Sequence, residues 1–168
     1  TRQARWLGIS NATSTSLRVS WYRGNGMQRL LMVKPAAGNF AADEIPADGV
    51  VAAISIEGDF SDPGNPDYAG AGATGTAVYK GTGSSCTVTG LSAGTEYTFY
   101  VMEFNARPDG SNPNYLDDNT VTANPVTFTT PVDAPTITSS TPTASTCTIN
   151  WSDAGVLATA GGGYIVQV

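Results

Sequence analysis

The side chains best suited to catalysis or metal binding in this chain are carboxylates, because none of its 168 residues is a histidine. Catalysis by Ser-His-Asp or Cys-His groups, metal binding by histidine and a histidine pH switch are thereby excluded. Four oxygen-bearing side chains surround one Pro-Gly turn, those of Asp59, Asp62, Asn65 and Asp67. Calcium takes about six to eight oxygen ligands from such loops, although this spacing matches no EF-hand. A calcium site and a solvated acidic turn both remain open, since these are also the common turn residues.

Paired carboxylates can act as general acid and base when their environments set their pKa values apart. No two carboxylates of this chain lie in apolar segments that would create such a difference. We therefore expect no enzyme activity, no catalytic residue, no cofactor-binding residue and, beyond the open calcium question, no metal ligand.

Cys86 and Cys147 are the only two cysteines, too few for a disulfide scaffold. Each alternates with threonine in a strand-like segment, so both are expected to face inward. Two interpretations remain open, a pair of buried free thiols and a disulfide between two halves of the molecule.

Other features could bind partners. The segment Ala106-Arg107-Pro108-Asp109-Gly110 lies in a long loop, where recognition is often located, but it is not an Arg-Gly-Asp sequence. Four tyrosines could form a platform for stacking sugars, namely Tyr68, Tyr79, Tyr100 and Tyr115. Aromatic residues in strands are more often core residues or cross-strand pairs, and the long loop is more often a simple surface connection. Asn11 and Asn150 begin sequons, which matter only in a secretory host that glycosylates them.

The charge and the length of the apolar runs argue against binding to nucleic acid and against a membrane span. The formal net charge is −6 and the sequence pI is about 4.3, so binding to a phosphate backbone is not expected. Residues 35–78 carry seven acids and no base, which makes this segment strongly acidic. No apolar run approaches the roughly 20 residues that cross a bilayer, and we expect no membrane span.

Several segments alternate between apolar and polar residues with the period of a β-strand. Leu17, Val19 and Trp21 share one face, and Cys86 and Val88 repeat the pattern. The segments 30–33 and 97–104 are apolar on both faces, which is typical of central strands. Because no segment has a convincing helical period, the sequence predicts an all-β antiparallel sandwich.

A corner motif refines this prediction. Leu91, Thr95 and Tyr97 stand in the order Leu-x-x-x-Thr-x-Tyr, which resembles the tyrosine corner of fibronectin type III domains with Ala93 in place of the usual proline. In that corner the tyrosine hydroxyl bonds back to the backbone of the preceding loop. The resemblance covers about residues 2–131 and implies an immunoglobulin-like β-sandwich.

A long insert interrupts the resemblance at residues 35–78, where a usual type III domain has a short C–C′ connection. The insert precedes Val78-Tyr79-Lys80-Gly81-Thr82-Gly83, and a Tyr115-Leu116 pair follows later. This order resembles an enlarged variant that is repeated in large secreted bacterial surface proteins. We expect the insert to lie outside the seven-strand frame, packed against a sheet edge by Phe40, Ile54 and Ile56.

An internal repeat indicates a second module. Residues 13–21 align with residues 143–151, with Trp151 at the position of Trp21, and a proline-flanked linker at 131–135 separates the two copies. Residues 1–131 are thus predicted to form one domain, and 132–168 the first three strands of an incomplete second module. Either the natural chain continues, or a neighbouring chain supplies the missing strands.

The resemblance implies a non-catalytic extracellular or cell-surface module that serves as spacer, adhesive surface or assembly unit, with protein partners or self-association. One alternative is a building block of an extracellular filament or virion appendage, completed by strands from a neighbouring chain. A weaker alternative is a carbohydrate-binding accessory module of a secreted hydrolase. The three differ in what they predict for exposed apolar contacts and exposed aromatic rings.

Overall fold

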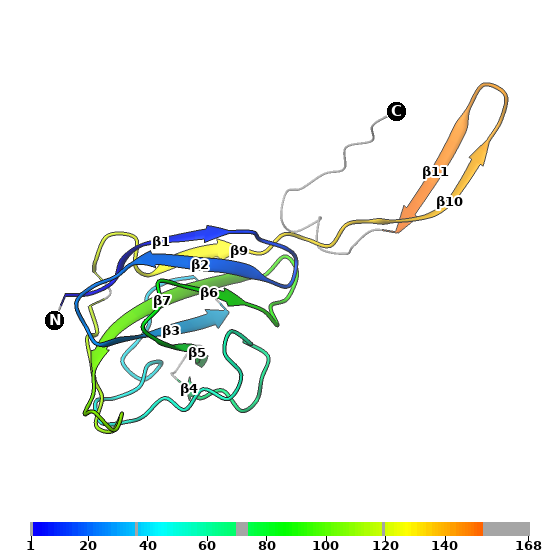
Figure 1. Ribbon diagram of the computed structural model, residues 1–168. Helices are drawn as coiled ribbons and strands as arrows, with labels where there is room; N and C mark the ends of the chain where they lie inside the picture. Colours follow the sequence, from blue (N-terminus) through cyan, green and yellow to red (C-terminus); the bar gives the residue numbers. More distant parts are fainter. Residues whose placement is uncertain (1, 36, 70–73, 119, 153–168) are drawn as a thin grey trace.

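The computed structural model describes residues 2–35, 37–69, 74–118 and 120–152. It consists of two antiparallel sheets that pack face to face, and a separate hairpin (Figure 1). The smaller sheet has the order β1-β2-β6, with bounds Arg5–Ser10, Leu17–Tyr22 and Ser85–Val88. The larger sheet has the order β4-β5-β3-β7-β8, and β9 also pairs with β7. Its strands are β3 (Gln28–Pro35), β4 (Asp67–Ala69), β5 (Thr74–Gly81), β7 (Glu96–Asn105), β8 (Asn114–Tyr115) and β9 (Val126–Thr129). The described ranges contain no helix, and therefore none that could span a membrane.

The space between the sheets is filled by the predicted alternating residues. Leu17, Val19 and Trp21 of β2 are buried against the inner face of the larger sheet, and Trp21 meets Tyr79 edge-on with ring centroids 5.6 Å apart. The same core holds Cys86, Leu91, Tyr97 and Val101. The predicted core is confirmed, because period-two alternation places one side of each strand inside.

The tyrosine corner is also confirmed. The backbone N–H of Ser92 donates a hydrogen bond of 2.9 Å to the hydroxyl of Tyr97. The turn before it is closed by the Thr95 hydroxyl, which donates to the carbonyl of Ala93 over 3.1 Å. The corner thus forms without the usual proline.

The insert covers a sheet face, which corrects the expectation that it packs against an edge. A second apolar cluster lies on the outer face of the larger sheet, where Phe40, Ile45 and Ala52 of the insert meet Leu30, Met32, Tyr100, Met102 and Phe104. Ile54 packs beside this cluster, but Ile56 is 52% exposed and does not. The cause is the two-sided apolarity of β3 and β7, since an apolar outer face needs its own cover. Two parts of the predicted insert, moreover, are strands of the sheet, β4 and the first half of β5.

The insert also closes the side of the sandwich between β5 and β6. Gly58 donates its N–H to Val78 in β5 and accepts a hydrogen bond from the N–H of Thr89, just past β6, over 2.7 and 2.8 Å. The ring of Phe60 then packs edge-on against Tyr97, with centroids 5.4 Å apart. One short segment of the insert therefore touches both sheets.

The hairpin comprises β10 (Thr136–Pro142) and β11 (Cys147–Ser152), whose residues are all exposed. Its turn repeats that of β1–β2. The hydroxyls of Thr143 and Thr146 lie 2.7 Å apart, and those of Thr13 and Ser16 lie 2.8 Å apart. In each copy the hydroxyl of the first threonine accepts a 2.9 Å bond from the backbone N–H three residues later. The internal repeat thus extends to matching turn geometry, whereas the predicted third strand at 163–168 lies outside the described residues.

Candidate functional site

The acidic turn does not gather its oxygens around one point. The Asp59 and Asp62 carboxylates accept hydrogen bonds from the backbone N–H groups of Ser61 and Gly64, over 2.9 and 3.2 Å. The Asn65 carboxamide binds the backbone at Ser55, Ile56 and Asp59, and Asp67 accepts from the Thr76 hydroxyl. No group of three metal-ligating side chains occurs in the part of the chain that the structure describes. The four residues of the calcium question hold turns together.

The four candidate tyrosines do not form an exposed platform. Tyr79, Tyr100 and Tyr115 are buried, and Tyr68 packs partly buried against the outer-face cluster. Burial raises the pKa of Tyr68 to about 12, as expected for a phenol withdrawn from water. The favoured interpretation of these tyrosines as core residues holds, and the alternative of a sugar-stacking platform is not realised, because the insert covers the face on which Tyr68, Tyr100 and Tyr115 lie.

The two cysteines differ in their exposure to solvent. Cys86 is buried and Cys147 is exposed, and both are free thiols, so the alternative of a disulfide is not realised. The expectation that Cys147 is buried fails because nothing covers the hairpin face within the described residues.

The loop segment 106–110 is a compact exposed turn, in which the N–H of Gly110 donates to the carbonyl of Arg107 over 2.8 Å.

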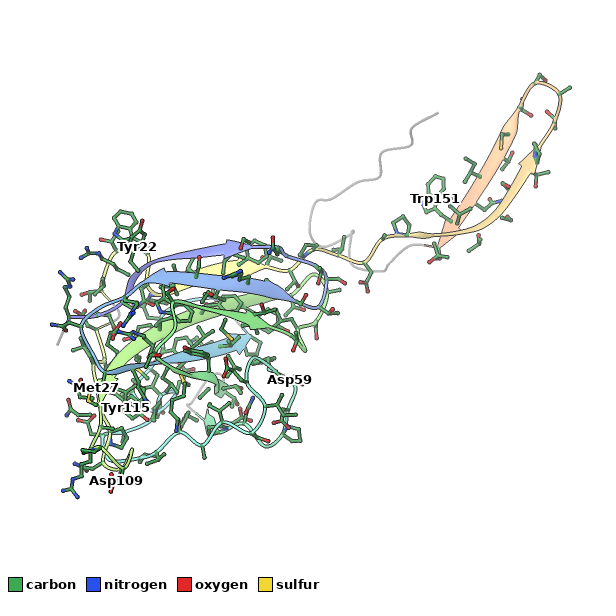
Figure 2. All side chains as sticks on the ribbon, viewed as in Figure 1. Tyr22, Met27, Asp59, Asp109, Tyr115 and Trp151 are labelled. Atoms are coloured by element: carbon green, nitrogen blue, oxygen red, sulfur yellow. The ribbon has the colours of Figure 1, made fainter. Side chains whose placement is uncertain are left out.

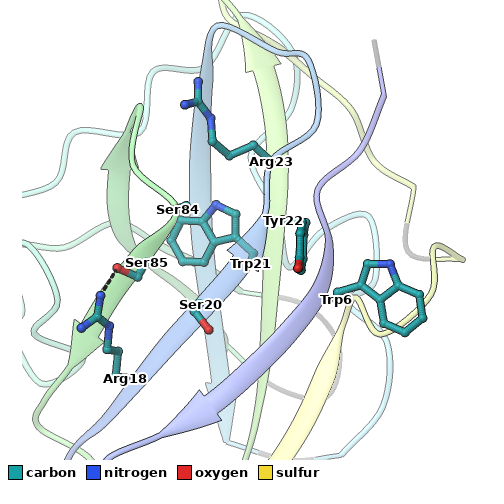
Figure 3. Close-up of a pocket in the computed structure, with 8 residues that line it drawn as sticks. All are labelled: Trp6, Arg18, Ser20, Trp21, Tyr22, Arg23, Ser84 and Ser85. Atoms are coloured by element: carbon teal, nitrogen blue, oxygen red, sulfur yellow. Dashed lines mark hydrogen bonds between the residues drawn. The ribbon is translucent and has the colours of Figure 1, made fainter.

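A groove that the sequence analysis missed lies at one end of the β1-β2-β6 sheet (Figure 3). It has a volume of about 590 Å³ and is lined by two tryptophans, one tyrosine, two arginines and three serines: Trp6, Trp21, Tyr22, Arg18, Arg23, Ser20, Ser84 and Ser85. We call it the aromatic–arginine groove. A second hollow of about 330 Å³ shares Trp6 and Tyr22 and adds Arg5. Both hollows are therefore lined by the two exposed rings and by arginine.

The exposed position of Trp6 depends on an irregular backbone. The pairing of β1 with β2 shifts register between Arg5 and Gly8, and Trp6 has a φ of 55°. A non-glycine residue seldom adopts this left-handed conformation, and a bulge of this kind re-aims a side chain. The N–H groups of Trp6 and Leu7 are held by the carbonyls of Thr122 and Ala123, over 3.1 and 2.9 Å. The indole is 55% exposed.

The arginines of the groove are not neutralised. The two ion pairs among the described residues join Arg29 to Glu103 and Lys34 to Glu44, and neither includes an arginine of the groove. Arg18 donates to the hydroxyl of Ser85 over 2.8 Å, which fixes its guanidinium along the groove wall. In a chain of net charge −6, this end of the small sheet is a local positive patch.

Part of this site was within reach of the sequence. The alternation that turns Leu17, Val19 and Trp21 inward also turns Arg18 and Ser20 outward, and Tyr22 follows on the same side. The exposed position of Trp6 could not be predicted from the sequence, because a bulge and a left-handed residue leave no periodic signal.

The order of the strands identifies the architecture of the sandwich that carries the groove. Three strands, β1, β2 and β6, form one sheet, while β5, β3, β7 and β9 follow one another in the other. This is the order A-B-E and C′-C-F-G. The sandwich has the fibronectin type III fold. Its aromatic–arginine groove therefore lies on the A-B-E sheet, and the insert of this type III sandwich covers the C′-C-F-G sheet.

Comparisons with known proteins were made at the levels of sequence and structure. No family model matches the chain. Exoglucanase B of Cellulomonas fimi is 42% identical over 85 residues, which is 51% of this chain and 7% of the exoglucanase. The chain therefore spans only a small part of that relative's length.

Three similar solved structures contain fibronectin type III domains. The FN5 domain of Drosophila Lar has 13% identity and a TM-score of 0.35, with coverage of 76% of this chain and 94% of that one. An FN3 domain of human collagen XX has 16% identity and a TM-score of 0.35, with coverage of 69% and 90%. A two-domain segment of chicken tenascin has 17% identity and a TM-score of 0.41, with coverage of 89% and 61%.

Proposed function

We propose that this chain is a non-catalytic module of a larger extracellular protein, in which type III sandwiches follow one another and present a binding surface. The main support is the repeat: a complete sandwich is followed by a hairpin with the same turn and the same tryptophan position as β1–β2. The match to a small part of a much longer exoglucanase supports the same modular role.

The hairpin has an apolar side that matches a buried side of the sandwich. Trp21 is 5% exposed, whereas its counterpart Trp151 is 42% exposed, and Ile137 and Ile149 are exposed as well (Figure 2). Isolated chains seldom leave such a cluster uncovered. We propose that residues 132–168 belong to a second sandwich whose other strands cover this side. In the alternative of a filament or virion appendage, strands of a neighbouring chain cover it.

The mass of the protein in solution distinguishes a second sandwich from strand donation between chains. Sedimentation of the 168-residue chain over a wide range of concentration is expected to show a monomer, because the first sandwich buries its own core. Polymers that lengthen with concentration, and that are lost in a Trp151→Ser variant, would instead support strand donation between chains. An Ile56→Ser variant is the matched control, since Ile56 is an exposed apolar residue outside the hairpin.

The exoglucanase match favours one second candidate, an accessory module of a secreted polysaccharide hydrolase. Such a module would carry no hydrolytic activity and would hold the enzyme near its substrate. The test is incubation of the chain with soluble glucans, followed by analysis of products and of bound sugar. Release of shorter sugars would contradict the non-catalytic role.

A further inference from the structure

We propose that the aromatic–arginine groove binds an acidic polysaccharide, in which carboxylate-bearing sugar rings follow one another. The proposal rests on the proposed role as a binding module and names its ligand class. No candidate considered from the sequence included Trp6 or Tyr22, the two rings on which the site depends.

The first step concerns the rings. Tyr22 is 69% exposed and lies on β2 directly opposite Arg5 of β1, so it is a neighbour of Trp6 at the same end of the sheet. Figure 3 shows both rings beside the groove, with Tyr22 between Trp21 and Trp6. Large rings left in water are unfavourable unless a ligand covers them, and flat rings suit the C–H faces of sugars.

The second step concerns charge. Arg18 and Arg23 line the groove, and Arg5 lines the second hollow, which shares Trp6 and Tyr22 with the groove. A guanidinium binds a carboxylate through two parallel hydrogen bonds, which selects acidic over neutral ligands. Because three arginines are spread over the two hollows that share these rings, a ligand with several carboxylates fits better than a single acidic sugar.

The third step separates a polysaccharide from a protein partner. Among the described residues, the groove is lined by rings, guanidinium groups and the hydroxyls of Ser20, Ser84 and Ser85, without an aliphatic side chain. Protein interfaces are also enriched in tryptophan, tyrosine and arginine, but their buried centres are more apolar than this lining. Hydroxyls beside rings and arginines instead match a ligand that combines C–H faces, hydroxyls and carboxylates.

Two further features are those of a binding site. The Nε1 of Trp21 in the groove wall is buried and has no hydrogen-bond partner among the described residues, an exception that calls for an explanation in a well-packed fold. The left-handed backbone at Trp6 is maintained by its bonds to Thr122 and Ala123, and such local strain is concentrated at ligand sites.

The test uses the whole chain and a short oligomer of galacturonic acid as the probe, with binding followed by calorimetry. A neutral cello-oligosaccharide of equal length and a polyglutamate peptide are the comparison ligands. We expect the oligogalacturonate to bind, and to weaken by about tenfold or more in Trp6→Ala and in Arg23→Gln. Two exposed residues outside the groove and the hairpin supply controls, and Ile56→Ala and Arg107→Gln should leave the affinity unchanged.

Each outcome decides the proposal. No binding of the oligogalacturonate by the folded chain, or equal losses in the control variants, would overturn it. Equal affinity for the neutral oligosaccharide would remove the role of the arginines, and tighter binding of polyglutamate would make the groove a protein-docking surface. None of these results affects the proposal that the chain is a non-catalytic module. That proposal fails if the oligogalacturonate is cleaved.

Discussion

Arg29 Nε lies 2.9 Å from Glu103 Oε1, and neither side chain reaches solvent. The carboxylate also accepts hydrogen bonds from the backbone N–H groups of Gly24 and Gly26, over 2.6 and 3.0 Å. A Cβ on Gly24 would collide with the carbonyl of Arg2, so the close approach of this turn requires glycine. The buried pair thus fixes the chain directly after Tyr22 and Arg23, two residues of the aromatic–arginine groove.

Replacing Glu103 by Ala should destabilise the sandwich strongly. The change leaves the Arg29 charge buried without its partner, at a cost of about 3–5 kcal/mol in the free energy of unfolding. Urea unfolding measures the loss. Glu96→Ala, an exposed change on the same strand, should stay within about 0.5 kcal/mol. Similar small losses for both variants would contradict the structural role of the pair.

The tyrosine corner gives a smaller and more specific effect. Tyr97→Phe removes only the hydroxyl that accepts from Ser92 and should cost about 1 kcal/mol. Tyr22→Phe, which loses an exposed hydroxyl, should be neutral in the same thermal or urea unfolding experiment. A neutral Tyr97→Phe would mean that water replaces the corner bond without loss.

Acid should weaken the attachment of the insert. Burial opposes ionisation of Glu44, but hydrogen bonds from Lys34 and from the Ala41 N–H, together with the charge of Lys34, outweigh it and lower the Glu44 pKa. A lowered pKa stabilises the fold above the ordinary carboxyl value of about 4.3, and this stability is lost as pH falls through the lower folded value. Glu44→Gln should therefore melt lower than wild type at neutral pH, and the gap should close in acid. Asp43→Asn, exposed and adjacent, should show no such change.

The two thiols should differ in reactivity. Burial, aided by the negative charge of Glu57, raises the pKa of Cys86 to about 12, and the thiolate is the reactive form. A chromogenic thiol reagent at mildly alkaline pH should thus modify one thiol per folded chain and two in urea. In Cys147→Ser the folded chain should not react. Rapid labelling of that variant would place Cys86 at the surface.

Calcium at millimolar concentration should leave the melting temperature unchanged, because the Asn65 carboxamide oxygen and one carboxylate oxygen each of Asp59, Asp62 and Asp67 accept hydrogen bonds from separate groups of the protein. Magnesium serves as the control for ionic strength. A rise of several degrees with calcium alone would demonstrate a site that binds the folded state.

Sequence patterning predicted the inner core, because Leu17, Val19 and Trp21 alternate on a strand with one buried face. It also predicted that the segment 97–104 is apolar on both faces, which is confirmed, but it did not indicate what covers the outer face around Tyr100. The cover over that strand is the insert, whose apolar residues Phe40, Ile45 and Ala52 follow no regular period. Trp6 was equally beyond reach, because its exposure comes from a bulge rather than from alternation.

The insert makes the two faces of this sandwich differ in charge. It covers the C′-C-F-G face with an acidic segment, seven acids without a base over residues 35–78, and leaves Arg5, Arg18 and Arg23 on the A-B-E side. We expect this uneven distribution of charge to turn the groove toward an anionic surface before contact is made. Salt should slow this oriented approach, since a Debye length of about 8 Å at physiological ionic strength is shorter than the sandwich.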